Sequence, residues 1–97
     1  METSPIIKPP VSKALKSGRV RLSPGEEIGE HVTEKREELL VVLKGTATLI
    51  NSGEVIELKE GETRYIKEGV KHNVKNTSNI PLEYIYVVSL FDSEKRL

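Results

Sequence analysis

The sequence contains no cysteine among its 97 residues. Neither a disulfide framework nor a thiolate ligand is therefore available, and a metal site would have to use nitrogen and oxygen ligands. Tryptophan and glutamine are also absent, while lysine and glutamate are frequent. This composition is typical of thermophilic proteins and favours a thermophilic source.

An excess of charge is missing as well, because 15 basic and 15 acidic residues balance and are interspersed. No basic stripe or polybasic segment is present, so we expect neither nucleic acid nor a membrane surface as a partner. No apolar run approaches the roughly 20 residues of a membrane span, and the first ten residues lack the apolar region of a signal peptide. We therefore expect a cytoplasmic protein.

The length leaves room for one compact domain but not for two. Pro5 and the pair Pro9-Pro10 disfavour a regular element at the start of the chain. We expect residues 1–10 to form an extended N-terminal arm, either disordered or lying along a partner subunit. Residues 11–97 are expected to form the single domain.

Short β-rich segments separated by turn residues make up most of that domain. They are residues 19–22, 46–50, 54–59, 63–66, 71–75 and 82–91. Asn51-Ser52-Gly53 predicts a hairpin turn, and the longest segment, residues 82–91, is expected to close a barrel. With no convincing long helix, the pattern predicts an all-β sandwich or barrel. The charged tail, residues 92–97, is expected to fray.

Residues 34–44 are ambiguous between helix and strand. Their first half is rich in helix formers, and Gly45 would suit a helix C-terminus. The second half is a continuous apolar run with adjacent β-branched residues, which favours a strand. We predict a strand buried on both faces. In so small a chain a second subunit would have to cover the outer face, which predicts a homodimer.

The alternation of side chains along these strands selects candidate metal ligands. Glu38, rather than Glu37, shares a face with the apolar residues of its strand, and His72 faces inward. His31 lies on another strand-like segment. Two imidazoles and one carboxylate suit Fe(II), Mn(II), Ni(II) or Zn(II). The sequence therefore predicts a metal site made of His31, Glu38 and His72.

These residues resemble the two motifs of the cupin superfamily in their order and spacing. The first motif is matched by Gly25, His31, Thr33, Glu38 and Gly45. The second motif is matched by Gly61, Lys67, Gly69, His72 and Asn76. The fifteen residues between Gly45 and Gly61 also match the short spacing typical of small microbial cupins.

The resemblance implies a small double-stranded β-helix, or jelly-roll barrel, which is usually dimeric and holds a metal through three histidines and one glutamate. Thr33 occupies the position of the second histidine, and a hydroxyl is a poor metal ligand. The missing ligand either opens a coordination position for substrate or oxygen, or means that metal binding has been lost. We expect Thr33 to orient a bound water. Lys67 stands in place of a proline, and little chemistry is expected from it.

Three functions are compatible with these residues, and whether the protein is an enzyme stays open. The first is a metal-dependent dioxygenase, isomerase or lyase acting on a small oxygenated substrate, with catalytic residues not identified. The second is a non-catalytic cupin that binds a sugar or a carboxylate with weak or no metal. The third is a structural module with a filled interior. Asn76 is expected to cap a turn, and Tyr84 and Tyr86 to pack in the core.

Overall fold

The computed structural model describes residues 1–91, and the predicted fraying tail, residues 92–97, lies outside the described residues. Nine strands and no helix occur in residues 1–91. The strands are β1 (Glu2–Ile7), β2 (Leu15–Leu22), β3 (His31–Val32), β4 (Arg36–Lys44), β5 (Ala47–Asn51), β6 (Glu54–Leu58), β7 (Thr63–Ile66), β8 (Lys71–Lys75) and β9 (Leu82–Leu90). Over this part of the chain no helix is long and apolar enough to cross a membrane.

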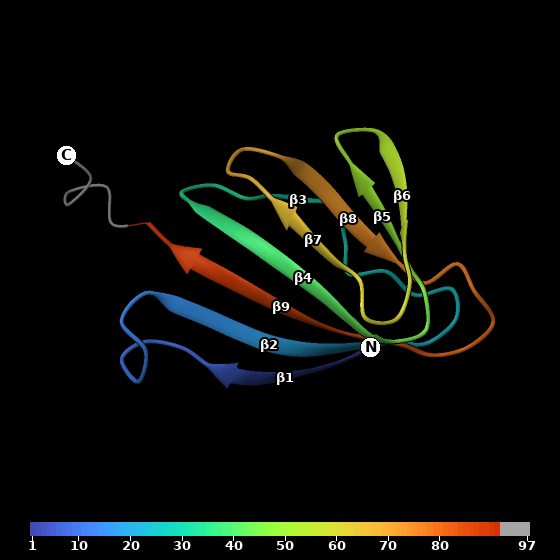
Figure 1. Ribbon diagram of the computed structural model, residues 1–97, viewed down its shortest axis with the longest axis horizontal. Coiled ribbons are helices and arrows are strands. Elements are labelled where there is room, and N and C mark those ends of the chain that lie inside the picture. Colours follow the sequence, from blue (N-terminus) through green and yellow to red (C-terminus); the bar gives the residue numbers. More distant parts are fainter. Residues whose placement is uncertain (92–97) are drawn as a thin grey trace.

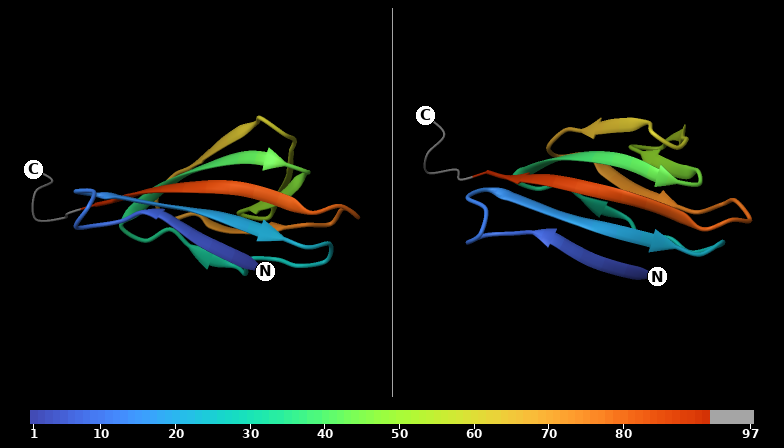
Figure 2. Two further views of the ribbon diagram at one scale, coloured as in Figure 1. Left: turned by 90° about the horizontal axis from the view of Figure 1, so that it is seen from below. Right: turned by 60° about the horizontal axis from the view of Figure 1, so that its bottom comes forward.

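The strands form two antiparallel sheets, with the order β1-β2-β9-β4-β7 in one and β3-β8-β5-β6 in the other (Figure 1). The two layers lie against each other and enclose the core (Figure 2). The predicted all-β fold class is therefore confirmed. The segment expected to close the barrel, residues 82–91, contains β9, which lies at the centre of its sheet and joins β2 on one edge to β4 on the other.

The alternation seen in the sequence decides which side chains enter the core. In β2, Val20 and Leu22 are buried while Arg19 and Arg21 are exposed. The buried apolar cluster consists of Val20, Leu22, Leu40, Val42, Ala47, Leu49, Leu58, Ile66, Val74, Leu82 and Tyr84. The hairpin between β5 and β6 is confirmed, with positive φ at both Ser52 and Gly53, as two-residue hairpin turns require.

The ambiguous segment is a strand, β4, because both of its edges are paired, with β9 and with β7. The expected burial on both faces, with a second subunit covering the outer face, stays a prediction. Leu40 and Val42 point into the core, but Leu39 on the outer face is 39% exposed, and its neighbours Val41 and Leu43 are only partly covered. The five-stranded sheet therefore presents an apolar outer face that residues 1–91 do not cover.

The N-terminal segment is more regular than expected. Glu2–Ile7 forms β1 and pairs with β2, so the prediction that no regular element would form is wrong for these residues. Pro5 is tolerated because β1 is an edge strand, where a missing N–H need not interrupt a ladder on the outer side. The register shifts between Pro5 and Ile7, which marks an irregularity beside the proline.

Gly45 connects β4 to β5 at a position where a side chain has no room. Its φ is +81°, and a Cβ built there would lie 2.5 Å from the carbonyl oxygen of Pro81. Gly53 has nearly the same φ, +84°, but nothing lies within 4 Å of a Cβ built there. A comparison of substitutions at the two glycines therefore distinguishes the cost of a positive φ from the cost of a clash with the Pro81 carbonyl.

We predict that Gly45→Ala lowers the free energy of unfolding by ~1–3 kcal/mol more than Gly53→Ala does, because only residue 45 adds a clash to the backbone strain that both variants share. Urea denaturation of the two variants and the parent measures this difference. Equal losses in the two variants would contradict it.

Candidate metal centre

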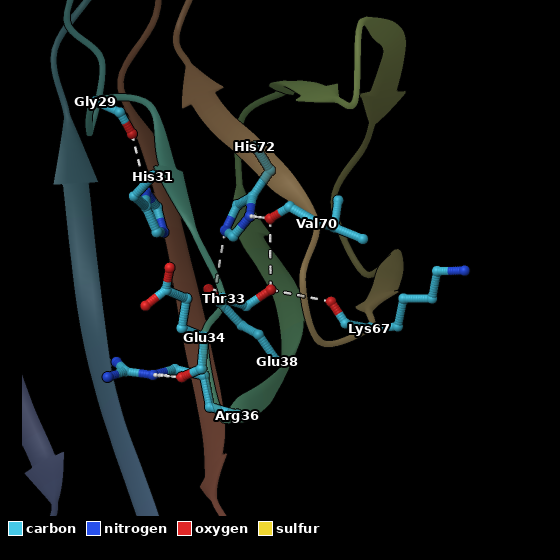
Figure 3. Close-up of polar contacts among 9 residues, drawn as sticks. All are labelled: Gly29, His31, Thr33, Glu34, Arg36, Glu38, Lys67, Val70 and His72. Carbon is cyan, nitrogen blue, oxygen red and sulfur yellow. Dashed lines mark hydrogen bonds and ion pairs between the residues drawn. The ribbon is translucent and has the colours of Figure 1, made fainter.

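His31 and His72 lie directly opposite each other on the neighbouring strands β3 and β8. Their ring centroids are 4.1 Å apart, and the rings meet at an interplanar angle of 61°. Figure 3 shows the two imidazoles side by side, above the carboxylate of Glu38. A short strand, only two residues long, therefore brings His31 beside a histidine about forty residues further along the chain.

Each imidazole contacts the backbone carbonyl two residues before it. His31 Nδ1 lies 2.9 Å from the Gly29 oxygen, and His72 Nδ1 lies 3.2 Å from the Val70 oxygen. Because a carbonyl only accepts hydrogen bonds, Nδ1 must carry the proton in both rings. In the neutral rings Nε2 then carries the free lone pair. Histidines that bind metals are oriented in this way.

Glu38 supplies the third candidate ligand from β4, in the other sheet. Glu38 is 9% exposed, and its Oε2 lies 3.4 Å from Nε2 of His72. That separation falls within ion-pair range, but the geometry does not make a hydrogen bond, so the buried Nε2 has no hydrogen-bond partner among the described residues. A lone pair and a carboxylate thus face each other, which favours a proton or a metal ion between them.

The structure brings the three predicted residues together. One ligand atom from each of His31, Glu38 and His72 lies within 4.8 Å of the others, with His31 exposed and the other two buried. The unpartnered Nε2 and the orientation of both rings fit a divalent metal. Glu37 lies on the outer face, as expected, where its carboxylate accepts a hydrogen bond from Tyr65 at 2.8 Å.

Thr33 is 1% exposed and lines the cavity that adjoins the three candidate ligands. Its hydroxyl donates to the carbonyl of Lys67 at 2.9 Å, and its backbone oxygen accepts from Gly69 N at 2.7 Å. The hydroxyl proton is thereby used within the protein. Thr33 retains only acceptor lone pairs for a water, and its predicted role in orienting one stays a prediction.

A cavity of about 280 Å³ opens beside the three residues. Glu38, Thr33 and His31 line it, together with Tyr84 and Tyr86 from β9. The interior is therefore not filled by aliphatic side chains, which disfavours a purely structural module. A small molecule has space next to the candidate ligands.

Two pKa shifts accompany this arrangement. Burial lowers the pKa of His72, but the Glu38 carboxylate and the Val70 carbonyl outweigh it, and the net pKa is raised above the ordinary 6.5. Burial, followed by the charge of Glu38, raises the pKa of Tyr84 far above its usual range. The Tyr84 hydroxyl consequently stays protonated.

Asn73 is a residue that the sequence pattern missed. Alternation places it on the outer face with the lysines of β8, but it is only 5% exposed. Its Oδ1 accepts from Gly29 N at 2.9 Å, and its Nδ2 donates to Glu27 at 3.0 Å. Asn73 thereby holds Gly29, whose carbonyl orients His31. No local signal reveals this, because the loop before β3 covers that face of β8 only in the folded chain.

Asn76 caps a turn, as predicted. Its Nδ2 donates to the carbonyls of Leu22 and Ile80 at 2.9 and 2.8 Å, and its Oδ1 accepts from the hydroxyl and backbone N–H of Ser78. Three of the four contacts lie within the turn before β9, and the fourth joins that turn to the end of β2 at Leu22. The amide of Asn76 is therefore occupied by structure rather than by a ligand.

The two facing sheets and the inward His-Glu-His group define a small cupin barrel. The chain belongs to the Cupin_2 family, the cupin domain, which matches residues 18–88. Cupins usually bind a metal ion, in agreement with the group found here.

Three comparisons illustrate this relationship. The chain is 30% identical over 79 residues to the oxalate-binding protein of Thermotoga maritima, covering 81% of this chain and 65% of that protein. It is 42% identical over 71 residues to a mannose-1-phosphate guanylyltransferase of Salmonella montevideo, covering 73% of this chain but 15% of that protein. The chain thus spans less than two thirds of the length of these curated relatives.

A crystal structure of a predicted oxalate decarboxylase from Thermotoga maritima superimposes with a TM-score of 0.85 at 26% identity. The match covers 92% of this chain and 79% of that one. The double-stranded β-helix fold implied by the motifs is therefore confirmed.

We predict that the metal-free protein loses stability as the pH rises above about 6.5, the ordinary pKa of an imidazole. The pKa of His72 is higher in the folded protein than in the unfolded chain, where it is near 6.5. Protonation of His72 therefore stabilises the folded state fully below the unfolded pKa, and this stabilisation is lost as the pH rises through the folded pKa. Urea denaturation in EDTA at several pH values measures the decline. Glu38→Gln removes the charge that raises the pKa and should flatten the decline, whereas Glu37→Gln should retain it. An equally steep decline in Glu38→Gln would refute the assignment.

Proposed function

We propose that the protein binds a divalent metal ion through His31, Glu38 and His72 and takes a small oxygenated ligand into the adjoining cavity. The observation that carries this proposal is the buried Nε2 of His72, which faces the Glu38 carboxylate at 3.4 Å and has no hydrogen-bond partner within residues 1–91. Fe(II), Mn(II), Ni(II) and Zn(II) all accept two imidazoles and one carboxylate.

When bound, such a metal supplies Lewis acidity toward a ligand oxygen. The chain contributes the orientation of the site: the carbonyls of Gly29 and Val70 hold the two imidazoles with Nε2 directed inward. Thr33 offers acceptor lone pairs to a bound water. Dioxygenase, isomerase and lyase reactions are all compatible with this arrangement, and fold alone does not choose among them.

A second function, a non-catalytic cupin that binds a small ligand with weak or no metal, has its own support. Thr33 leaves the site with two imidazoles instead of the three that the family motif provides. The Thermotoga maritima relative is named for binding oxalate rather than for a reaction. Metal content distinguishes the two functions.

We predict that protein purified without an affinity tag takes up about one Zn²⁺ or Mn²⁺ per chain after EDTA treatment and dialysis. His72→Ala should weaken binding more than about 100-fold, since losing a ligand exceeds the usual effect of losing an outer partner. His31→Ala tests the site without a core change because His31 is exposed. Isothermal titration measures both, with Lys71→Ala as the control. Undiminished binding in both histidine variants would exclude this site, and a parent without metal would favour the second function.

We also propose that the protein is a homodimer joined through the outer face of the five-stranded sheet. Leu39 and Val41 of β4 lie beside Val87 and Ile85 of β9 in register, and all four are at least partly exposed. Apolar patches of this kind are typical of interfaces. A second copy would complete the burial that the sequence of β4 predicts.

We predict that Leu39→Glu converts this dimer to a monomer, because a carboxylate would have to be buried at the centre of the interface. Light scattering after size-exclusion chromatography gives the mass directly. Val55→Glu, on the exposed β6 of the other sheet, should leave the mass unchanged. A monomeric parent at about 100 μM, well above the roughly micromolar Kd of even weak standard-sized interfaces, would contradict the proposal.

A further inference from the structure

The wall that β2, β9 and β4 contribute to the cavity carries its own polar groups. Lys16, Val88 and Glu38 lie in one row across the three strands, and Gly18 and Tyr86 lie opposite each other in the next row. All but Gly18 line the cavity, as do Tyr84 and Arg36. The register therefore sets a lysine two strands away from the candidate metal ligand Glu38.

The hydroxyls of Tyr84 and Tyr86 form no hydrogen bond within residues 1–91, the described part of the chain. Tyr84 is 3% exposed and packs in the core as predicted, yet its hydroxyl has no hydrogen-bond partner among residues 1–91, and neither has that of Tyr86. Neither hydroxyl oxygen is a fully buried atom among the described residues, so both are accessible at the cavity and can donate to a ligand there. Tyr84 is thus a nine-tenths buried side chain whose polar end is free at this cavity.

Gly18 makes room for one of these rings. A Cβ at position 18 would lie 2.6 Å from the Tyr86 hydroxyl oxygen and 2.8 Å from its ring. The ring of Tyr86 therefore lies across the backbone of β2, in a space that only glycine leaves open. This position carries the hydroxyl toward the strand that bears Lys16.

The cations of this wall lack carboxylate partners. Neither Lys16 nor Arg36 forms an ion pair in the part of the chain that the structure describes. Arg36 donates through Nε to the carbonyl of Glu34 at 3.3 Å, and its guanidinium extends away from His72 (Figure 3). Glu38 is the one carboxylate among the described residues that line the cavity. The positive charges of Lys16 and Arg36 therefore exceed the single negative charge of Glu38, even without a bound metal ion.

We propose that Tyr84, Tyr86 and Lys16 form a subsite for the carboxylate of a small organic anion, with Arg36 adding positive charge at the cavity mouth. The inference deepens the proposed function, because this anion would be the ligand that shares the cavity with the metal. Ammonium, guanidinium and tyrosine hydroxyl groups all donate hydrogen bonds, and a carboxylate accepts them. A neutral sugar would gain no charge pairing from either cation, both of which are exposed.

Phosphate fits this wall less well than a carboxylate. Phosphate sites commonly use helix N-termini or clusters of backbone N–H groups, and residues 1–91 contain no helix. Here the donors are side-chain groups from three strands. The two oxygens of a planar carboxylate can each meet a hydroxyl or the ammonium group.

The test is titration of malonate into the EDTA-treated and the Zn²⁺-treated protein by isothermal calorimetry, with glucose and inorganic phosphate as comparison ligands. We expect malonate to bind most tightly. Tyr84→Phe should weaken malonate binding about tenfold or more, because it removes one hydrogen bond to a charged group. The free energy of unfolding should not fall. Lys16→Gln should weaken malonate binding similarly. Tyr65→Phe and Lys44→Gln, outside the cavity lining, are the matched controls.

Unchanged malonate affinity in both Tyr84→Phe and Lys16→Gln would overturn the subsite, as would glucose or phosphate binding as tightly as malonate. The metal titration is independent of this result. A parent that binds metal but no malonate in either form refutes the subsite and leaves the metal proposal standing. A parent that binds malonate but takes up no metal supports the subsite and refutes the metal centre.

Discussion

The structure of the site depends on one buried contact, in which Nε2 of His72 faces the carboxylate of Glu38 at 3.4 Å. The Val70 carbonyl holds the proton of the ring on Nδ1, so the neutral ring turns a lone pair toward a negative charge. This contact is unfavourable unless a positive charge lies between the two groups. It also joins β8 of one sheet to β4 of the other, so the cation that satisfies it would link the two layers.

The two sheets contribute different chemistry to the cavity. The four-stranded sheet supplies the imidazoles of His31 and His72, both oriented by backbone carbonyls of their own segments. The five-stranded sheet supplies Glu38 and the unused tyrosine hydroxyls of β9. Asn73 supports the first wall through Gly29, and Gly18 supports the second by making room for Tyr86. The proposed metal and the proposed anion therefore lie between two separately built walls.

Most of the fold was predictable because strand alternation is a local property. It identified the inward faces of β2, β4 and β8, and it chose Glu38 over Glu37 correctly. Alternation and residue type grouped His31, Glu38 and His72, and the family motifs agreed with this grouping. Local patterns failed where a distant segment decides the environment. The sequence around Pro5 does not indicate a strand, because β1 forms only by pairing with β2. Asn73 is buried only because the loop before β3 covers it.

The sequence by itself thus determined the class of fold, the inward faces of β2, β4 and β8, and the identity of the candidate ligands. The tertiary structure alone decided the central position of β9, the partnerless Nε2, and the meeting of Lys16, Tyr84 and Tyr86 in one cavity. The reason is physical. Alternation follows from the geometry of a single strand, whereas distances across strands depend on register and on how the two layers pack.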